Sequence, residues 1–468
     1  MGAEATLTMP VDFKVELVKE PELVMPEQPV EEQHYFLSNL DQNIAVVMKT
    51  IYLFESSSAR AADNPADVIR QGLSKALDHY YPLAGRLGIS SEGKLEVVMK
   101  KSGDGAEQQG VVFAEAEADA RICDLGDIIR PGSTPLLQLV YAIPGAKNVL
   151  EVPPMTVQVT KFKCGGFVLG LCINHCMFDG IGAMEFVHGW AELSRGVPLS
   201  LNPELDRSVL KARSPPLVEF PHLEYAQVDD VSGGSQQNLH LNDDDQLVYR
   251  VFRIRGQQLE QLKSQIDNEM VAAQEDNVDV PGWRKCSTFE ALSALVWKCR
   301  TKALAMDDRQ PSKLLFAVDY RSRIQPPLPK GFMGNGIMLT YAMATASELE
   351  SKHLSEVVSL VRDAIARIHD SYIRSSIDCF ELQRFCPSLF STLLVSTWSR
   401  LSFHTTDFGW GEPLHSGPVG FSEPEVCLFL SHGRETKDMN LILGFRSDAM
   451  TRFHDELEQV LGQVLCST

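Results

Sequence analysis

Residues 162–190 read FKCGGFVLGLCINHCMFDGIGAMEFVHGW, and the organisation of the chain follows from this stretch outward. Its first part, Phe167–Ile173, is an apolar run of the length and composition of a strand buried on both faces. After a break at 174–180, apolar residues recur at helical spacing, and Gly196 follows as a candidate C-cap. A buried strand, a short loop and an amphipathic helix therefore follow one another, which is typical of an α/β fold.

The loop between this strand and helix contains His175 and, four residues later, Asp179. A neutral imidazole titrates near about pH 6.5 and can accept a proton from a hydroxyl at neutral pH. A rigid strand end suits a catalytic base, because a loop leaving it can open into a cavity. Asp179 either orients the ring or ties the loop down through an ion pair elsewhere. The alternative is a structural histidine with a carboxylate four residues away by chance.

Composition describes an ordinary globular protein and limits its partners. A chain of 468 residues exceeds what one core usually supports, so two domains of comparable size are expected. Lys and Arg number 43 against 62 Asp and Glu, and the net charge of −19 argues against nucleic acid and anionic membranes as partners. The ten cysteines form no C-x-x-C pair, and the first residues do not resemble a secretory signal. We therefore expect reduced thiols and a cytoplasmic protein without an integral membrane segment.

Strand-like and helix-like segments alternate in both halves of the chain, separated by a Pro/Gly/Ser-rich connection. We expect an N-terminal domain at 1–199, a crossover at 200–241 and a C-terminal domain at 242–468. Periodicity also predicts a strand at Leu136–Ile143 and one long helix at Leu354–Ile373. The pattern alone leaves open whether the sheets are parallel or mixed.

Several common catalytic motifs are absent from the sequence. It contains no H-E-x-x-H zinc motif, no G-x-S-x-G elbow and no glycine-rich phosphate loop, so it does not favour a metal site, a serine hydrolase or a nucleotide-binding fold. Residues 407–413 read DFGWGEP. This segment is either part of a catalytic site or a tight turn that packs two aromatic side chains. The two glycines favour the turn.

The two ordered motifs, HCMFDG at 175–180 and DFGWG at 407–411, together resemble the plant BAHD acyl-CoA-dependent acyltransferases. The resemblance extends to YPLAGR at 81–86 and to the GNG turn at 334–336. It implies a chloramphenicol-acetyltransferase-like α/β fold, in which two similar domains of mixed sheet plus helices enclose a channel. It also implies a monomer that uses acyl-CoA as co-substrate, with no other cofactor and no metal.

Within this family, three stretches resemble the fatty omega-hydroxyacid and fatty alcohol hydroxycinnamoyl transferases of suberin and cutin. They are YFLSNLDQN at 35–43, residues 163–185 and WSRLSFHTTD at 398–407. Relatives that use shikimate or quinate hold the acceptor carboxylate with an arginine in the segment before Trp398. Here that segment is longer and apolar, and its one arginine, Arg384, does not align with that position.

The resemblance therefore implies transfer of a feruloyl or related hydroxycinnamoyl group from CoA to a fatty omega-hydroxy acid or fatty alcohol. The alternatives are the same chemistry on shikimate, quinate, a polyamine or another alcohol, and a family-like protein that binds without catalysis. The intact His175 and Asp179 argue against the last alternative.

The resemblance also assigns residue roles. His175 would be the base, Asp179 would pair with Arg321, and Trp398 would lie near the oxyanion on the acceptor side, with Ser396 or Thr397 as further donors. The residues expected to contact CoA are Ser287, Thr288, Ala317 and Asp319. The residues expected to be structural are Asp407, Gly409 and Gly411.

Overall fold

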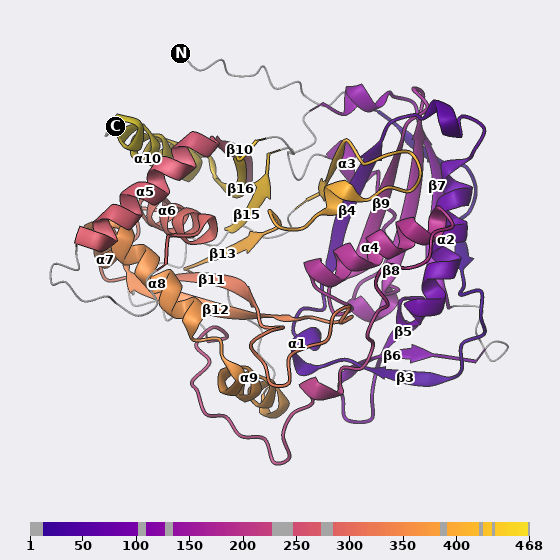
Figure 1. Cartoon of the computed structure of the whole chain (residues 1–468), viewed down its shortest axis with the longest axis horizontal. Helices are drawn as coiled ribbons and strands as arrows, with labels where there is room; N and C mark the ends of the chain where they lie inside the picture. Colours follow the sequence, from indigo (N-terminus) through magenta and orange to yellow (C-terminus); the bar gives the residue numbers. More distant parts are fainter. Residues whose placement is uncertain are drawn as a thin grey trace.

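Figure 1 shows the computed structural model of the chain, which describes residues 13–101, 109–126, 134–226, 247–272, 284–383, 391–420, 425–432 and 436–466. Two α/β units lie side by side, the first half of the sequence at the right of the view and the second half at the left. Each half contains a large mixed sheet with helices against it, which confirms the predicted α/β fold class. Along the described residues, every helix is too short or too polar to cross a membrane.

The described residues form a seven-stranded sheet in the first unit with the order β1-β7-β8-β9-β4-β14, and β2 also pairs with β7; its edge strand β14 comes from the second half of the sequence. The β7–β8 pair is parallel and the other pairs are antiparallel. Its strands are β1 (Val15–Leu17), β2 (Glu22–Val24), β4 (Val47–Phe54), β7 (Val111–Ala118), β8 (Met155–Phe162), β9 (Phe167–Asn174) and β14 (His415–Pro418). A small sheet joins β3 (Gln33–Phe36), β6 (Leu95–Met99) and β5 (Arg86–Ile89).

In the second half, the described residues form a six-stranded sheet with the order β10-β16-β15-β13-β11-β12. The pairs of β13 with β11 and with β15 are parallel, and the others are antiparallel. Its strands are β10 (Leu247–Ile254), β11 (Pro311–Asp319), β12 (Ile337–Thr345), β13 (Thr392–Thr397), β15 (Val426–Ser431) and β16 (Met439–Arg446).

Helices lie against both sheets (Figure 1). In the first half they are α1 (Asn39–Gln42), α2 (Pro65–His79), α3 (Thr134–Leu137) and α4 (Gly180–Ser194). In the second half they are α5 (Gly256–Ala272), α6 (Thr288–Ala303), α7 (Ala346–Ser351), α8 (Leu354–Ala366), α9 (Asp370–Leu382) and α10 (Ser447–Cys466).

Strand β9 is buried along its whole length, as its apolar run predicts. Its odd-numbered residues face the core beneath α2 and α4, and Val168 and Cys172 face a second core on the other side of the sheet. The predicted strand at Leu136–Ile143 is wrong: this segment forms the end of α3 followed by turns. Its apolar side chains cover the second core, and a Cβ at Gly170 would lie 1.9 Å from the carbonyl oxygen of Leu139. The apolar pattern there reflects packing onto a sheet.

The single helix predicted at Leu354–Ile373 is also wrong, because it is two helices, α8 and α9. His369 adopts an extended conformation and caps α9, and its ring accepts a hydrogen bond from the backbone of Tyr372. Arg323 donates to the carbonyls of Ile365 and Ile368 and so satisfies the end of α8. The apolar periodicity continues across the break, because both helices bury a face in the same core.

Residues 398–420 cross from the second half to the first. Strand β14 pairs with β4, and the side chains of Phe403, Phe408 and Trp410 belong to the core beneath α4. The described part of the crossover, up to residue 226, contacts both halves: Arg207 pairs with Asp41 of the first half at 2.9 Å, and Arg213 pairs with Asp378 of the second half at 2.6 Å. The division into domains at 199 and 242 stays a prediction.

Candidate active site

His175 follows directly on the end of β9, where its backbone N–H donates to the carbonyl of Val46 at 2.7 Å. The neighbouring side chains, Cys176, Met177 and Phe178, are buried in the core, whereas the His175 side chain is partly exposed. The loop is therefore anchored on both sides while the imidazole remains reachable. A rigid support of this kind holds a reacting side chain in place.

The carboxylate of Asp179 has an anchoring role in the loop and in the junction between the halves. Its Oδ1 caps α4 by accepting from the backbone N–H groups of Ile181 and Gly182, both at 3.1 Å. Arg321 donates to both oxygens at 2.8 Å, and the N–H of Gly336 donates to Oδ2 at 2.9 Å. Of the two roles that the sequence left open, the geometry is that of an ion pair that ties the loop down.

This ion pair is almost excluded from water, since the side chain of Asp179 is 1% exposed and that of Arg321 is 16% exposed. Burial alone would lower the pKa of Arg321, but the adjacent Asp179 carboxylate offsets this and raises the pKa above its ordinary value. The glycine after Asn335 permits the approach, because a Cβ at Gly336 would lie 2.3 Å from Nη1 of Arg321.

Asn335, which the sequence analysis did not single out as a site residue, contacts the His175 ring. Its Oδ1 lies 3.0 Å from Nδ1 of His175, and its Nδ2 donates to the carbonyl of His175 at 2.9 Å. The Tyr320 hydroxyl donates to the carbonyl of Asn335 at 2.6 Å, and burial raises the pKa of Tyr320 well above its ordinary value, which keeps the phenol a donor. Among the described residues, the hydrogen bond of the His175 side chain is made through Nδ1, and none is made through Nε2.

A second buried ion pair lies behind Asn335. Asp41, on α1, accepts from the backbone N–H and the Nδ2 of Asn335 at 2.9 and 2.8 Å. Its other oxygen accepts from Arg207 at 2.9 Å, and both side chains are fully buried. Arg207 also donates to the carbonyls of Cys176 and Met177, next to His175. The sequence signals were a Ser-x-x-Asp capping pattern at 38–41 and an asparagine between two glycines, and neither indicated that these residues meet.

Trp398 lies at the end of β13, where its backbone N–H donates to the carbonyl of Phe429 at 2.9 Å. Its ring packs 5.9 Å from that of Phe403, and Leu401 on the same segment covers the first residue of α4, so that a Cβ at Gly180 would lie 2.7 Å from Leu401. This segment therefore lays apolar side chains against the N-terminus of α4, beside the His175 loop. The Thr397 hydroxyl contacts that of Ser399 at 3.0 Å. Arg384 lies outside the described residues.

The residues expected to contact CoA lie at the start of α6 and the end of β11. Ser287 caps α6 in a capping box with Glu290, and Thr288 is the first helical residue. The rings of Phe289 and Phe316 are 5.2 Å apart and bring these two elements together, so that Ala317 and Asp319 follow on the neighbouring strand.

The motif at 407–411 forms a turn. One oxygen of Asp407 accepts from the N–H groups of Gly409 and Gly411 at 2.7 and 2.9 Å, and both glycines have positive φ angles. The ring of Phe408 packs 5.3 Å from that of Trp190 on α4, and the ring of Trp410 packs 5.3 Å from that of Phe167 on β9. The turn thus fastens the crossing segment 398–420 to the sheet that carries His175.

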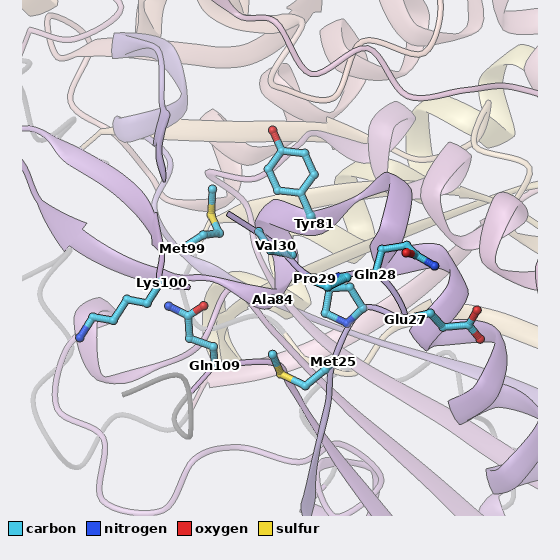
Figure 2. Close-up of a pocket in the computed structure, with 11 residues that line it drawn as sticks. Met25, Glu27, Gln28, Pro29, Val30, Tyr81, Ala84, Met99, Lys100 and Gln109 are labelled. Atoms are coloured by element: carbon cyan, nitrogen blue, oxygen red, sulfur yellow. The ribbon is translucent and has the colours of Figure 1, made fainter. Parts of the chain in front are cut away.

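A separate cavity of about 210 Å³ lies beside the small sheet (Figure 2). Residues 25–30, Tyr81, Met99 and Lys100 contribute to its lining. The residues that the sequence analysis assigned to catalysis or CoA binding do not line it.

Known proteins similar to this chain point to one family. The sequence profile of the Transferase family matches residues 13–460. An omega-hydroxypalmitate O-feruloyl transferase of Arabidopsis thaliana is 51% identical over 442 residues, which cover 94% of this chain and 92% of that protein. A fatty alcohol:caffeoyl-CoA acyltransferase of Arabidopsis thaliana is 47% identical over 437 residues, which cover 93% of this chain and 96% of that protein.

The structural comparison agrees. The crystal structure of vinorine synthase superposes with a TM-score of 0.66 and 24% identity, over 94% of this chain and 96% of that one. At this identity the superposition shows a shared fold. The sequence profile and the two relatives, which match over more than nine-tenths of the chain, show family membership. The chain therefore belongs to the Transferase family, the BAHD acyl-CoA-dependent acyltransferases.

Proposed function

We propose that this protein transfers a feruloyl or related hydroxycinnamoyl group from CoA to the terminal hydroxyl of a long-chain omega-hydroxy fatty acid or a fatty alcohol. The observation that carries this proposal is the similarity, over more than nine-tenths of both chains, to two relatives named for fatty acceptors. The anchored His175 loop supports the chemistry, because it presents a partly exposed imidazole.

In the proposed reaction, Nε2 of His175 removes the proton of the acceptor hydroxyl while the oxygen attacks the thioester carbonyl. The C–O bond forms, the carbonyl oxygen becomes an oxyanion, and the C–S bond then breaks. The proton passes from His175 to the departing CoA thiolate, so that the products are the ester and free CoA. Acyl-CoA is the co-substrate, and the proposed step uses no other cofactor.

The oxyanion needs hydrogen-bond donors at the point where negative charge develops. We place Trp398, with Ser396 or Thr397, on this side of the site, since the 398–403 segment lies against the start of α4. The start of α6 and the end of β11, with Ser287, Thr288, Ala317 and Asp319, form the proposed CoA side. Asp179 and Arg321 hold the loop in place.

The apolar side chains of Trp398, Leu401 and Phe403, which pack on the core beneath α4, support a fatty acceptor. Each methylene that the site buries contributes about 0.8 kcal/mol, or roughly fourfold in kcat/KM. Efficiency should therefore rise steeply along a series of primary alcohols until the site is filled. Shikimate and quinate, which carry a carboxylate, should be poor acceptors.

The test is to measure kcat/KM with feruloyl-CoA for 1-hexanol, 1-hexadecanol, 16-hydroxypalmitate and shikimate in matched detergent. The His175→Ala variant serves as the control for uncatalysed transfer. We expect the two long-chain acceptors to exceed 1-hexanol and shikimate. A higher kcat/KM for shikimate than for 1-hexadecanol, or a kcat/KM that does not depend on chain length, would overturn the fatty acceptor. Either result would leave the acyltransferase assignment in place.

We also propose that the protein acts as a monomer in the cytoplasm. The free thiols of the described cysteines support this location, because disulfides are rare in reducing compartments. Size-exclusion chromatography with light scattering tests the monomer, and fractionation of expressing cells tests the location.

A further inference from the structure

The side-chain amide of Asn335 can adopt only one of its two orientations. Its Nδ2 faces the carboxylate of Asp41 at 2.8 Å and the carbonyl of His175 at 2.9 Å. Both of these groups can only accept hydrogen bonds, so the NH₂ group must be the one that faces them. Its two hydrogens are thereby used, and Oδ1 is left facing Nδ1 of His175 at 3.0 Å.

This orientation determines which nitrogen of the neutral His175 ring carries the proton. An amide oxygen can only accept, so Nδ1 must carry the hydrogen and donate it to Asn335. Nε2 is then the unprotonated nitrogen with a free lone pair. In the proposed function, Nε2 is the atom that takes the hydroxyl proton.

We propose that Asp41 is a positioning residue that selects the active tautomer of His175 through Asn335. A flipped amide would place Oδ1 of Asn335 against two acceptors, the Asp41 carboxylate and the His175 carbonyl. It would also turn NH₂ toward Nδ1 of His175, which would move the ring proton to Nε2 and block the base. Asp41 is fully buried, and so is its partner Arg207, so the carboxylate holds its place away from solvent.

The donors around Asp41 make Asp41→Asn an informative change. Its Oδ2 accepts from Arg207 at 2.9 Å and from the N–H and hydroxyl of Ser38 at 2.8 and 2.6 Å. In the Asp41→Asn variant, the remaining oxygen is expected to stay with these three donors, one of them charged, rather than with the two donors on the other side, the backbone N–H and the NH₂ of Asn335. The new NH₂ group then faces Asn335 and favours the flipped amide.

This inference rests on the proposed role of His175 as base, and its first test does not depend on activity. Wild-type protein with ¹⁵N-labelled histidine rings is examined by NMR at about pH 8.5, two units above the ordinary imidazole pKa of about 6.5. The His175→Gln variant identifies the His175 signals among the 12 histidines. We expect a protonated Nδ1 and an unprotonated Nε2. The reverse assignment would overturn the inference while leaving feruloyl transfer untouched.

The second test compares Asp41→Asn with Asp378→Asn. Asp378 is a matched control, because it is 1% exposed, pairs with Arg213 at 2.6 Å and accepts the backbone N–H groups of Arg213 and Leu217. Both variants should lose thermal stability. In Asp41→Asn alone, the proton should move to Nε2, with little change in KM.

The expected loss of kcat in Asp41→Asn lies between about 10-fold and the roughly 10⁴-fold that a wrong tautomer costs a serine protease. An unchanged tautomer, with kcat within about threefold of the Asp378→Asn value, would overturn the role of Asp41. If Asp41→Asn does not fold, Asp41→Ser replaces it with the same criteria, and the wild-type spectrum remains decisive.

Discussion

Replacing Asp179 with asparagine should damage stability and turnover together, because this carboxylate holds two parts of the chain in one arrangement. It accepts two hydrogen bonds from the Arg321 guanidinium, one from the Gly336 N–H and two from the first turn of α4. An asparagine keeps the shape but has only one acceptor oxygen and no charge. The guanidinium would be left buried without its counter-ion.

The size of the effect follows from burial. The pair is 1% and 16% exposed, and breaking a buried pair by removing one partner costs about 3–5 kcal/mol. An unfolding entropy of about 2.1 cal/mol/K per residue amounts to about 1 kcal/mol/K for the whole chain. Tm should therefore fall by about 3–5 °C if the chain unfolds as one unit, and by about twice that if one half unfolds separately.

The assay is thermal unfolding followed by circular dichroism, together with kcat for feruloyl transfer on the same preparations. Asp319→Asn is the control for stability, because Asp319 also lies near Arg321, at 3.4 Å, but is 49% exposed. An exposed pair of this kind is worth about 0–1 kcal/mol, so Tm should hardly change.

A double variant separates two effects of Asp179→Asn: the loss of the ion pair and the burial of an Arg321 guanidinium without a counter-ion. Adding Arg321→Gln to Asp179→Asn removes the uncompensated guanidinium, so the double variant should be less destabilised than the sum of the two single variants. An Asp179→Asn protein with an unchanged Tm and no activity would refute the anchoring role and point to a direct part for Asp179 in the chemistry.

Two further variants test the base and the turn. His175→Ala should lower kcat by about 10²–10⁴-fold with Tm and CoA-ester binding nearly unchanged, since a positioned base contributes that much; a variant that keeps more than about a tenth of wild-type kcat would show that His175 is not the base. Gly409→Ala should lose stability, because φ is +107° and the new Cβ would lie 2.6 Å from the Arg60 side chain. Gly411→Ala, with φ of +88° and open space around it, should lose only the roughly 1–3 kcal/mol of backbone strain; equal melting temperatures for the two would contradict the packing argument.

Short-range features of this protein could be predicted from the sequence. Strand β9 and helix α4 lie where the patterns indicate them. Each is decided by hydrogen bonds and burial within a few consecutive residues, so a local pattern is sufficient. The turn held by Asp407 is of the same kind, since its carboxylate accepts from N–H groups two and four residues away.

Burial alone was misleading where an apolar pattern had more than one structural explanation. The segment at 136–143 is apolar because it covers a sheet, and the pattern at 354–373 is continuous because α8 and α9 share one core. In both places periodicity reports which side chains are buried. It does not report whether the backbone pairs with a strand or breaks between two helices.

The candidate site likewise contains residues that the sequence indicates and residues that only the tertiary structure brings together. The spacing of His175 and Asp179 in one loop could be read directly from the sequence, and the partner Arg321 followed from the family resemblance. Tertiary structure alone brings Asn335 to the His175 ring, 160 residues away, and Asp41 to Asn335, 294 residues away. These contacts depend on how the two halves of the chain pack against each other. No local pattern encodes them, because the hydrogen bonds that select the tautomer of His175 exist only after the halves have met.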